Sequence, residues 1–560
     1  MNRRFVLAII LTALVIVGTP LIFPPGPRTG TRADSVAAAA RTPTESTPRT
    51  EPANAPARSA TPTASAQPSR ALSDVQDTIT VRTRLTHYRF NALGAAPVSA
   101  ELDSYPSRRP GRKGLATNLV TAPGRLVGYR LAIGADTVLL DTVRFSRLNT
   151  PPSEIDYAAS VLGHTVRISY RLPKSADEEY RLQVAARVDS VPAGASLLVA
   201  LPTTIESNEP DTLDDMNHLG VSLRPIRGDV SSTNFSKLDP GEVRTETGPF
   251  TWAAVRDKYF LVVARTNAVP FTTARIQGLA RTGKVASHVL TEATLPLKNG
   301  AASFEIYAGP QDFERLQRLG GDLDQVNPYA GWFHGVVQPV AALVMKALLW
   351  MKRTTRLNYG WVLVLFGVAI RLLLWPLNQS AMRTSMKMQR LQPELQALQK
   401  KYADDPRKQQ EAVMKVYKDH DMSPLSPVMG CLPMLLPMPV LFALYFVFQN
   451  TIEFRGVPFL WLPDISLRDP FYITPLLMGV SMFVMSWIGM RNSPPNAQAK
   501  MMSYMMPVMF TVLFLNFAAG LNLYYAVQNI AALPQQWLLA RERSKLPPLP
   551  AAGERKGRTA

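Results

Sequence analysis

The first apolar stretch of the chain lies at its N-terminal end. Phe5 to Phe23 are nineteen apolar or small residues, and Arg3 and Arg4 precede them. As a helix rising about 1.5 Å per residue, this stretch would span roughly 28 Å, close to the thickness of the hydrocarbon core of a bilayer. The apolar region of a cleaved signal peptide is usually shorter, about 7 to 15 residues. We therefore predict an uncleaved transmembrane anchor over residues 1–23.

The polar region that follows divides into a tether and a folded domain. Residues 24–73 are mostly Pro, Thr, Ala, Ser and Arg, which bury too little apolar surface to offset the entropy of folding. Residues 74–327 instead show alternating apolar positions between clusters of Gly, Pro and Asn, for example Val166, Ile168 and Tyr170. Because side chains of a strand alternate between two faces, the sequence predicts a disordered tether and then an antiparallel β-sandwich.

One segment of this β-domain resembles a phosphate-binding loop. Gly278, Gly283 and Lys284 have the required spacing, but Val285 stands where the magnesium-binding hydroxyl belongs, and no helical pattern follows. The sequence therefore predicts a pair of strands here. The six histidines of the chain are scattered without the spacing of metal ligands, so we expect no metal site.

The C-terminal part of the chain contains apolar stretches whose orientation follows from charge. Residues 328–357 are interrupted by polar side chains and flanked by aromatic ones, which is typical of an amphipathic helix at the membrane surface. Residues 358–377 form a cleaner span, and the hairpin 378–424 after it is rich in Lys and Arg, which favour the cytoplasmic side. We therefore place the hairpin and the N-terminus inside, with 328–357 on the outer surface.

Further spans follow the hairpin. Residues 428–449 and 471–490 are two apolar segments joined by a nearly neutral outer loop. Residues 501–539 would be about 58 Å long as one helix, nearly twice the bilayer core, so we predict two spans with a turn at 518–520. The prediction is an α-helical membrane protein of six transmembrane helices plus a large periplasmic β-sandwich domain. Five of the helices lie within 358–540, and the basic tail 541–560 ends in the cytoplasm.

Composition changes this picture little. The net charge is +19 and the pI is near 10, as in many nucleic-acid-binding proteins. The basic residues cluster beside apolar spans, however, so cytoplasmic loops and anionic lipid explain them more simply, and we expect no direct DNA binding. Cys431 is the single cysteine, which excludes a disulfide within the chain.

Arg371 is the most informative residue because it interrupts an apolar span. It lies six residues, roughly 9 Å, from the cytoplasmic end of that span at Leu377. Burying an arginine costs about 2.5 to 3.5 kcal/mol on insertion scales, so the side chain needs water or a partner, or it must snorkel to the headgroups. Position alone leaves both interpretations open. The later spans contain no Asp or Glu, which favours a water-filled groove and argues against a carboxylate proton relay.

Two weaker patterns have an ordinary explanation beside a functional one. The hairpin 378–424 predicts two helices broken near Asp404-Asp405-Pro406, which form either a cytoplasmic contact surface or a solvated linker. The spans are rich in Met, which packs adaptably against unrelated apolar segments but is also common at lipid-facing positions.

Several motifs of the C-terminal part resemble the YidC-type insertases of the YidC/Oxa/Alb family. They occur in the family's order from about residue 328 to 543, whereas 24–327 is similar only in position and β-character. The motifs are Arg371 to Pro376, Ser385-Met386-Lys387-Met388, Leu391-Gln392-Pro393, Gly430-Cys431-Leu432-Pro433, Met438-Pro439, Asp469-Pro470-Phe471-Tyr472-Ile473, Gly520-Leu521 and Leu523-Tyr524-Tyr525. Ser423-Pro424 and Pro437 depart from the family pattern and leave the exact lining of the groove open.

The resemblance implies an insertase of the bacterial inner membrane. Such a protein receives hydrophobic segments of nascent membrane proteins in a hydrophilic groove and releases them into the lipid bilayer, alone or with the Sec translocon and the ribosome. The implied groove residues are Arg371, Met438, Pro439, Tyr524 and Tyr525. Because no bond is made or broken, the resemblance implies no enzyme activity, catalytic residue or cofactor, and the β-domain would be a supersandwich without a catalytic role.

Two other classes of function require features that this sequence lacks. A solute transporter or channel with a periplasmic binding domain needs intramembrane ligands and usually internal repeats, and the sequence contains neither. A membrane-anchored carbohydrate enzyme needs paired carboxylates in the β-domain. Glu178-Glu179 and Asp214-Asp215 are adjacent, and neighbouring residues of a strand point to opposite faces.

The predicted topology can be tested by labelling single cysteines in a variant that lacks Cys431. A cysteine at Ser385 or Thr559 should resist a membrane-impermeant thiol reagent applied from outside, because both positions are expected in the cytoplasm. A cysteine at Ser232 should react. Labelling of position 385 from outside would contradict the charge-based orientation.

Overall fold

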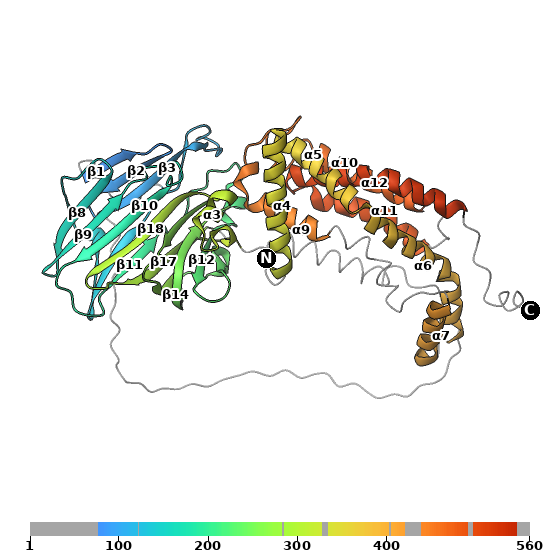
Figure 1. The fold of residues 1–560 in the computed structure, drawn as a ribbon, viewed down its shortest axis with the longest axis horizontal. Helices are drawn as coiled ribbons and strands as arrows, with labels where there is room; N and C mark the ends of the chain where they lie inside the picture. The colour runs from blue at the N-terminus through green and yellow to red at the C-terminus, as the bar shows by residue number, and fades with distance from the viewer. Residues whose placement is uncertain are drawn as a thin grey trace, which may run out of the picture. The chain divides into compact units, whose positions relative to one another are not determined.

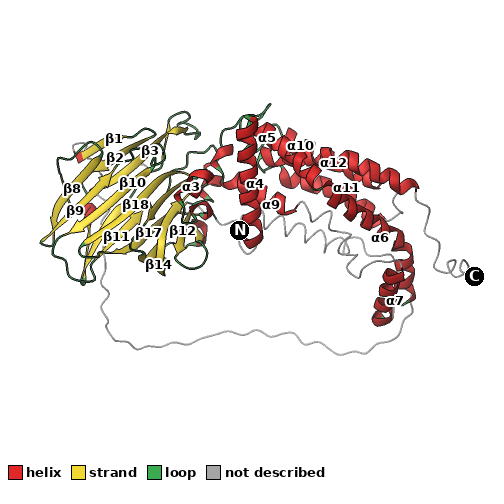
Figure 2. Cartoon of the chain, viewed as in Figure 1, coloured by secondary structure: helices red, strands yellow, loops and turns green. Residues whose placement is uncertain are grey.

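The computed structural model describes residues 77–120, 123–282, 285–327, 334–402, 405–419, 438–490 and 497–545. The predicted anchor and tether, the Gly430-Cys431 motif and the tail beyond Lys545 lie outside these residues. In the described part, strands occupy the chain as far as Pro310, and helices form most of the remainder, as Figures 1 and 2 show.

The first four strands form a small antiparallel sheet in the order β1-β2-β3-β4. On this sheet Tyr88, Phe90 and Leu102 are fully buried and join the apolar core of the β-domain. The bounds are β1 (Thr78–Arg82), β2 (Thr86–Asn91), β3 (Ala96–Pro106) and β4 (Ala116–Asn118).

The other fourteen strands form one large sheet. Its order is β6-β5-β11-β17-β16-β14-β15-β18-β10-β9-β8-β7, and β12 pairs with both β13 and β14. The bounds are β5 (Gly128–Ile133), β6 (Asp136–Leu139), β7 (Ser146–Arg147), β8 (Glu154–Val161), β9 (His164–Arg171), β10 (Arg181–Val188), β11 (Ser196–Leu201), β12 (Gly220–Pro225), β13 (Ser231–Asn234), β14 (Val243–Arg256), β15 (Phe260–Arg265), β16 (Phe271–Thr282), β17 (Val285–Pro296) and β18 (Ala301–Pro310).

The alternation in the sequence sets the register of these strands. In β9 and β10, Ile168 lies opposite Ala186 and Tyr170 opposite Val184, and all four side chains are buried. A shift of one residue would turn this apolar set toward water, so burial of one face fixes the pairing. The hydroxyl of Tyr170 hydrogen-bonds to the carbonyl of Ala95 at 2.8 Å, which satisfies its polar atom inside the core.

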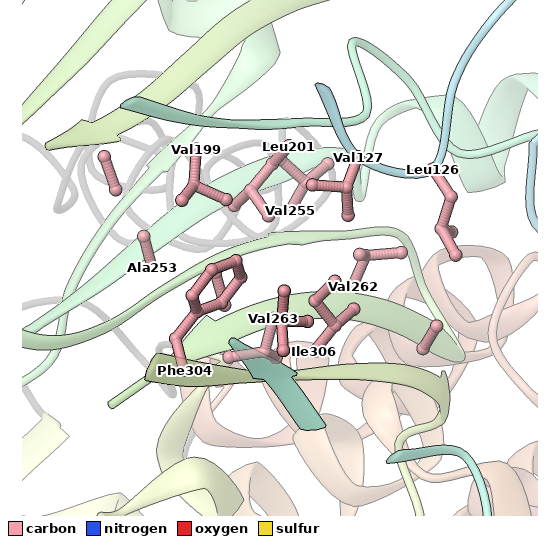
Figure 3. Packing of buried hydrophobic residues seen from close by; sticks show 14 of the residues in the cluster. Leu126, Val127, Val199, Leu201, Ala253, Val255, Val262, Val263, Phe304 and Ile306 are labelled. Atoms are coloured by element: carbon pink, nitrogen blue, oxygen red, sulfur yellow. The ribbon is translucent and has the colours of Figure 1, made fainter. Parts of the chain in front are cut away.

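The core lies between facing parts of the β-domain. Figure 3 shows Val199 and Leu201 of β11 across the core from Val263 of β15 and Ile306 of β18. Burying a Val, Leu or Ile side chain contributes roughly 1.5 to 3 kcal/mol. The predicted β-rich domain is therefore present, and its core is its main source of stability.

The segment that resembles a phosphate-binding loop belongs to a hairpin. Gly278 lies within β16, β17 begins at Val285, and Ala274 pairs with Ala293 between the two strands. This confirms the predicted pair of strands.

Helices form the second part of the described chain. After α2 (Thr212–Met216) and α3 (Phe313–Leu319) in the β-domain, they are α4 (His334–Thr355), α5 (Tyr359–Leu373), α6 (Trp375–Lys401), α7 (Pro406–Asp419), α9 (Met438–Asn450), α10 (Ile473–Met490), α11 (Ala497–Phe514) and α12 (Ala519–Lys545). The chain turns between α6 and α7 near the predicted break at Asp405, and between α11 and α12 over residues 515–518.

The number of transmembrane helices stays a prediction. Among the described helices, α10 alone is long and apolar enough to cross a membrane by itself. α4 and α5 meet these conditions only as a pair, and they are bent by 117° at the break between them. The apolar parts of α9 and α11, Pro439–Asn450 and Met501–Phe514, are shorter.

The loop between α9 and α10 covers one end of the helices. Phe454, Phe459 and Ile465 of this loop are buried in the same apolar cluster as α5, α9 and α12. The backbone N–H of Gly520, at the start of α12, donates to the carbonyl of Ile465 at 2.8 Å. At the start of α5, the amide of Asn358 donates to the carbonyl of Pro458 at 2.9 Å. The loop therefore closes the end at which α5 and α12 begin.

The β-domain holds this loop through two ion pairs of opposite direction. Arg455 of the loop donates to Glu209 of the β-domain at 2.6 Å, and their side chains are only 4% and 6% exposed. Arg108 of the β-domain pairs with Asp464 of the loop, whose side chain is fully buried. Removing one partner of a buried pair leaves an uncompensated charge and costs about 3 to 5 kcal/mol. The two pairs therefore specify one way of docking.

A third acidic group at this junction is shifted in pKa. Oε1 of Glu453 accepts a hydrogen bond from the backbone N–H of Phe313 at 3.1 Å. Oε2 is buried and has no hydrogen-bond partner among the residues that the structure describes. Burial first, and then the negative charges of Asp312 and Glu314, raise the pKa of Glu453 to about 8.

The raised pKa of Glu453 predicts a pH-dependent stability. In the folded protein the carboxyl keeps its proton up to about pH 8. In the unfolded chain the same carboxyl loses its proton at about pH 4.3. Its contribution is therefore fully present below about pH 4.3 and is lost as pH rises through about 8. We expect Glu453→Gln, whose side chain stays neutral, to show a smaller fall in melting temperature than the wild type between about pH 5 and about pH 8.5. The melting temperature is measured on the detergent-solubilised protein. The exposed Glu411→Gln is the control, and an unchanged pH profile for Glu453→Gln would contradict the prediction.

Candidate functional site

The candidate site lies where α5 packs against α12. Gly367 of α5 allows the close approach, because a Cβ at this position would lie 3.0 Å from Val527 Cγ1. Its carbonyl accepts a hydrogen bond from the Gln528 side chain at 2.9 Å. Gln528 also donates to the hydroxyl of Tyr524 at 3.1 Å. This contact satisfies polar groups that are expensive to leave unpaired among apolar helices.

Arg371 lies one turn further along α5 and meets a second glutamine. Its Nη2 donates to Oε1 of Gln535 at 2.9 Å, and Nε2 of Gln535 donates to the carbonyl of Trp375 at 3.0 Å. Gly367 and Arg371 are four residues apart on α5, and Gln528 and Gln535 are seven apart on α12. Both spacings keep the residues on one face of their helix. The glutamines on one face of α12 therefore hydrogen-bond to one face of α5.

The positive charge of Arg371 is not neutralised by the residues around it. The ion pairs of the described residues include none with Arg371, and its Nε is buried without a hydrogen-bond partner among them. The acceptor that it does have, Gln535, is neutral. The arrangement therefore presents a positive charge inside an apolar group of helices.

The two predicted tyrosines of the site belong to different helix contacts. Tyr524 is buried, and its ring centre lies 6.0 Å from that of Phe366 on α5. The Tyr525 ring faces away toward Phe514 of α11, at 5.6 Å. Tyr524 thus belongs with Arg371 to the α5–α12 contact, through Gln528 and Gln535, whereas Tyr525 belongs to the contact between α11 and α12.

Met438 and Pro439 are not joined to this contact by the hydrogen bonds that the structure describes. Met438 is the first residue of α9, and its side chain lies outside the described part; Pro439 is half-buried. α9 packs mainly against α4. The role expected for these two residues stays a prediction.

The glutamines are the functional candidates that sequence reasoning missed. The signal was present, since Gln528, Asn529 and Gln535 interrupt an otherwise apolar stretch. Asn529 donates to Ser481 of α10 at 3.1 Å, so it serves the neighbouring helix. Only the packing of α12 between α5 and α10 tells which amide faces Arg371.

The adjacent carboxylates of the β-domain are not on strands, which corrects the sequence-based expectation. Asp214 and Asp215 lie in α2, and Glu178 and Glu179 lie in the turn before β10. Asp214 pairs with Lys258 at 3.0 Å, while Asp215 is buried. One pair lies in a short helix and the other in a turn, and period-two reasoning applies to neither. No described group of His, Cys, Asp and Glu could hold a metal ion.

Comparison with known proteins covers both parts of the chain. Residues 78–343 match the family described as YidC periplasmic domain, and residues 350–545 match the family described as 60Kd inner membrane protein. A membrane protein insertase YidC from Anaeromyxobacter sp. is 35% identical over 401 residues, which are 69% of this chain and 68% of that protein. The chain belongs to the YidC family.

Other YidC proteins match over different lengths. The insertase of Oleidesulfovibrio alaskensis is 29% identical over 466 residues, covering 80% of this chain and 78% of that one. The match to the insertase of Anaeromyxobacter dehalogenans is 36% identical but spans 59% of either protein. The chain thus aligns with less than two thirds of the length of some YidC relatives.

Solved structures are similar to this YidC family member at low identity. A crystal structure of an active YidC insertase is 20% identical, with a TM-score of 0.33, and covers 83% of this chain and 93% of its own. A galactose mutarotase-like protein from Lactobacillus casei is 12% identical, with a TM-score of 0.29, and covers 42% of this chain and 99% of its own.

Proposed function

We propose that the protein is a membrane protein insertase and not an enzyme. It receives hydrophobic segments of nascent membrane proteins in a hydrophilic groove between its helices and releases them into the bacterial inner membrane. The observation that carries this proposal is the charge of Arg371, held between α5 and α12 by a neutral amide without a carboxylate. Membership of the YidC family supports it.

The charge would act on the flank of the incoming segment. An acidic or polar flank loses hydration when it enters the inner leaflet, and a nearby guanidinium lowers that cost. The apolar segment would meanwhile move along the spans that contain α9 and α12, and then partition into lipid. Its contacts would be Met438 and Pro439 on α9, and Tyr524 and Tyr525 on α12. No bond changes, so the residues need to bind and release rather than react.

Closure of the outer side would keep the membrane sealed during this process. The loop between α9 and α10 covers the helix ends at which α5 begins. Arg371 lies twelve residues after Tyr359, about 18 Å along the helix. This distance supports a groove that opens toward the cytoplasm and the lipid but not toward the periplasm. Six spans with both termini inside, the Sec translocon and the ribosome complete the proposal.

The alternative is a solute transporter or channel with a periplasmic binding domain. Transporters bind their coupling ion and substrate near the bilayer midplane, often with carboxylates or broken helices. Arg371, with a single neutral partner, offers no ligand set for a cation. The insertase therefore accounts better for the residues at the α5–α12 contact.

Substitution of Arg371 tests the proposed mechanism. We expect Arg371→Lys to retain much of the insertion activity, because a point charge suffices in a hydrated groove. Arg371→Ala should lose insertion of clients with an acidic translocated flank by roughly tenfold or more, as for loss of a charged hydrogen bond, with less effect on clients with neutral flanks. Insertion is measured by protease protection of the translocated flank.

The protein level of each variant is the control in this experiment. Removing a charge from the membrane part should not destabilise the fold, since burying that charge was costly. Equal insertion of acidic and neutral clients by a well-expressed Arg371→Ala variant would overturn the proposed role of the charge.

A truncated protein tests whether the β-domain is accessory. We expect a variant lacking roughly residues 30–300 to insert a simple client protein still, because Arg371, Gln528 and Gln535 all lie outside this range. The truncation removes Glu209 and Arg108 together with the surface that buries their partners, so Arg455 and Asp464 return to water instead of remaining as buried charges. Complete loss of insertion by a stably expressed truncation would show a direct role of the domain.

A further inference from the structure

Gln535 is a buried amide at the point where three helices meet. Its side chain belongs to α12, and the residue is 1% exposed. It accepts from Arg371 near the end of α5 and donates to the carbonyl of Trp375, the first residue of α6. One side chain therefore connects the helix that carries the charge, the helix that begins the basic hairpin, and the last helix.

The chemistry of the two partners allows one orientation of this amide. A guanidinium has donors and no acceptor, and a backbone carbonyl has only acceptors. Oε1 must then face Arg371, and Nε2 must face Trp375. Turning the amide over would place donor against donor and acceptor against acceptor, so the two contacts hold each other in place.

A glutamine holds the guanidinium without cancelling its charge. A glutamate here would form an ion pair with Arg371 and neutralise the positive charge. An apolar residue would leave the charge but release the side chain, because a free arginine has many rotamers. The neutral amide combines a fixed position with a charge that stays available.

We propose that Gln535 is a positioning residue for Arg371, which keeps the guanidinium in place for the acidic flank of a client. This role rests on the proposed function, since it matters only if the charge of Arg371 acts on clients. Gln535 does not itself need to touch the client.

The test compares two substitutions of Gln535 with the same two at Gln536. Gln536 is the next residue of α12, also an amide, and its side chain lies toward Gly489 of α10 rather than toward Arg371. Clients are two versions of one single-span protein whose translocated flank is either acidic or neutral. Insertion of both is measured in vesicles containing equal amounts of each full-length variant.

We expect Gln535→Glu to lower insertion of the acidic client by about tenfold or more, as Arg371→Ala does, and to leave the neutral client within about twofold. Gln535→Leu should lower insertion of the acidic client by a smaller factor, because the charge of Arg371 remains but its side chain is no longer held in place. Gln536→Glu and Gln536→Leu should change neither ratio. If Gln535→Leu lowers the protein level, Gln535→Met repeats the test with a side chain of similar length.

A double variant separates positioning from a general structural role. If Gln535 acts through Arg371, then Arg371→Ala with Gln535→Leu should insert the acidic client no worse than Arg371→Ala alone. Additive loss, or equal loss for acidic and neutral clients, would overturn the assignment in favour of a packing role.

The remaining outcomes also decide between the two proposals. If Arg371→Ala discriminates between the clients but every Gln535 variant behaves as the wild type, the positioning role is wrong and the proposed function stands. If Arg371→Ala does not discriminate, the proposed charge mechanism fails and the positioning role fails with it.

Discussion

The need to give a guanidinium a hydrogen-bond partner among apolar helices governs the arrangement of the membrane part. Arg371 cannot be left bare, because an unpaired polar group in such surroundings is costly. α12 supplies Gln535 as the acceptor, and Gln528, two turns earlier on α12, donates to the carbonyl of Gly367 on α5. The small residue at 367 lets the two helices approach closely enough for both contacts. The contact between α5 and α12 thus packs the two helices, provides hydrogen-bond partners for their polar groups and fixes the position of a positive charge.

Polar contacts and apolar packing are also combined at the other end of these helices, where the loop between α9 and α10 meets the β-domain. The buried pair Arg455–Glu209 and the pair between the half-buried Arg108 and the buried Asp464 hold the loop, while its apolar side chains fill the space between helix ends. Buried ion pairs add little net stability compared with apolar packing, but they penalise any other docking strongly. The β-domain therefore contributes orientation at this junction, whereas its own stability comes from the apolar core between its strands.

Much of this could be predicted from single positions and short patterns. The period of two around Val166 to Tyr170 predicts paired strands, and β9 and β10 pair through those residues. The absence of Asp and Glu from the later spans favours a water-filled groove around Arg371, which stays a prediction, and the partner that the structure describes for its guanidinium is the neutral Gln535. The prediction was wrong for Asp214-Asp215, which lie in a short helix, because a helix of five residues is too short to produce a periodic pattern in the sequence.

The sequence by itself determined the β-domain and the apolar helical part, and it singled out Arg371 as a charge within an apolar span, because composition, periodicity and the cost of a buried charge are properties of local stretches. Only the tertiary structure decided that Gln535 is the partner of Arg371, that Tyr524 and Tyr525 face different helices, and that Glu209 meets Arg455. The residues of the two polar pairs stand 164 and 246 positions apart along the chain. No local pattern specifies such partners, because the rotation and depth of each helix are set by the packing of all its neighbours at once.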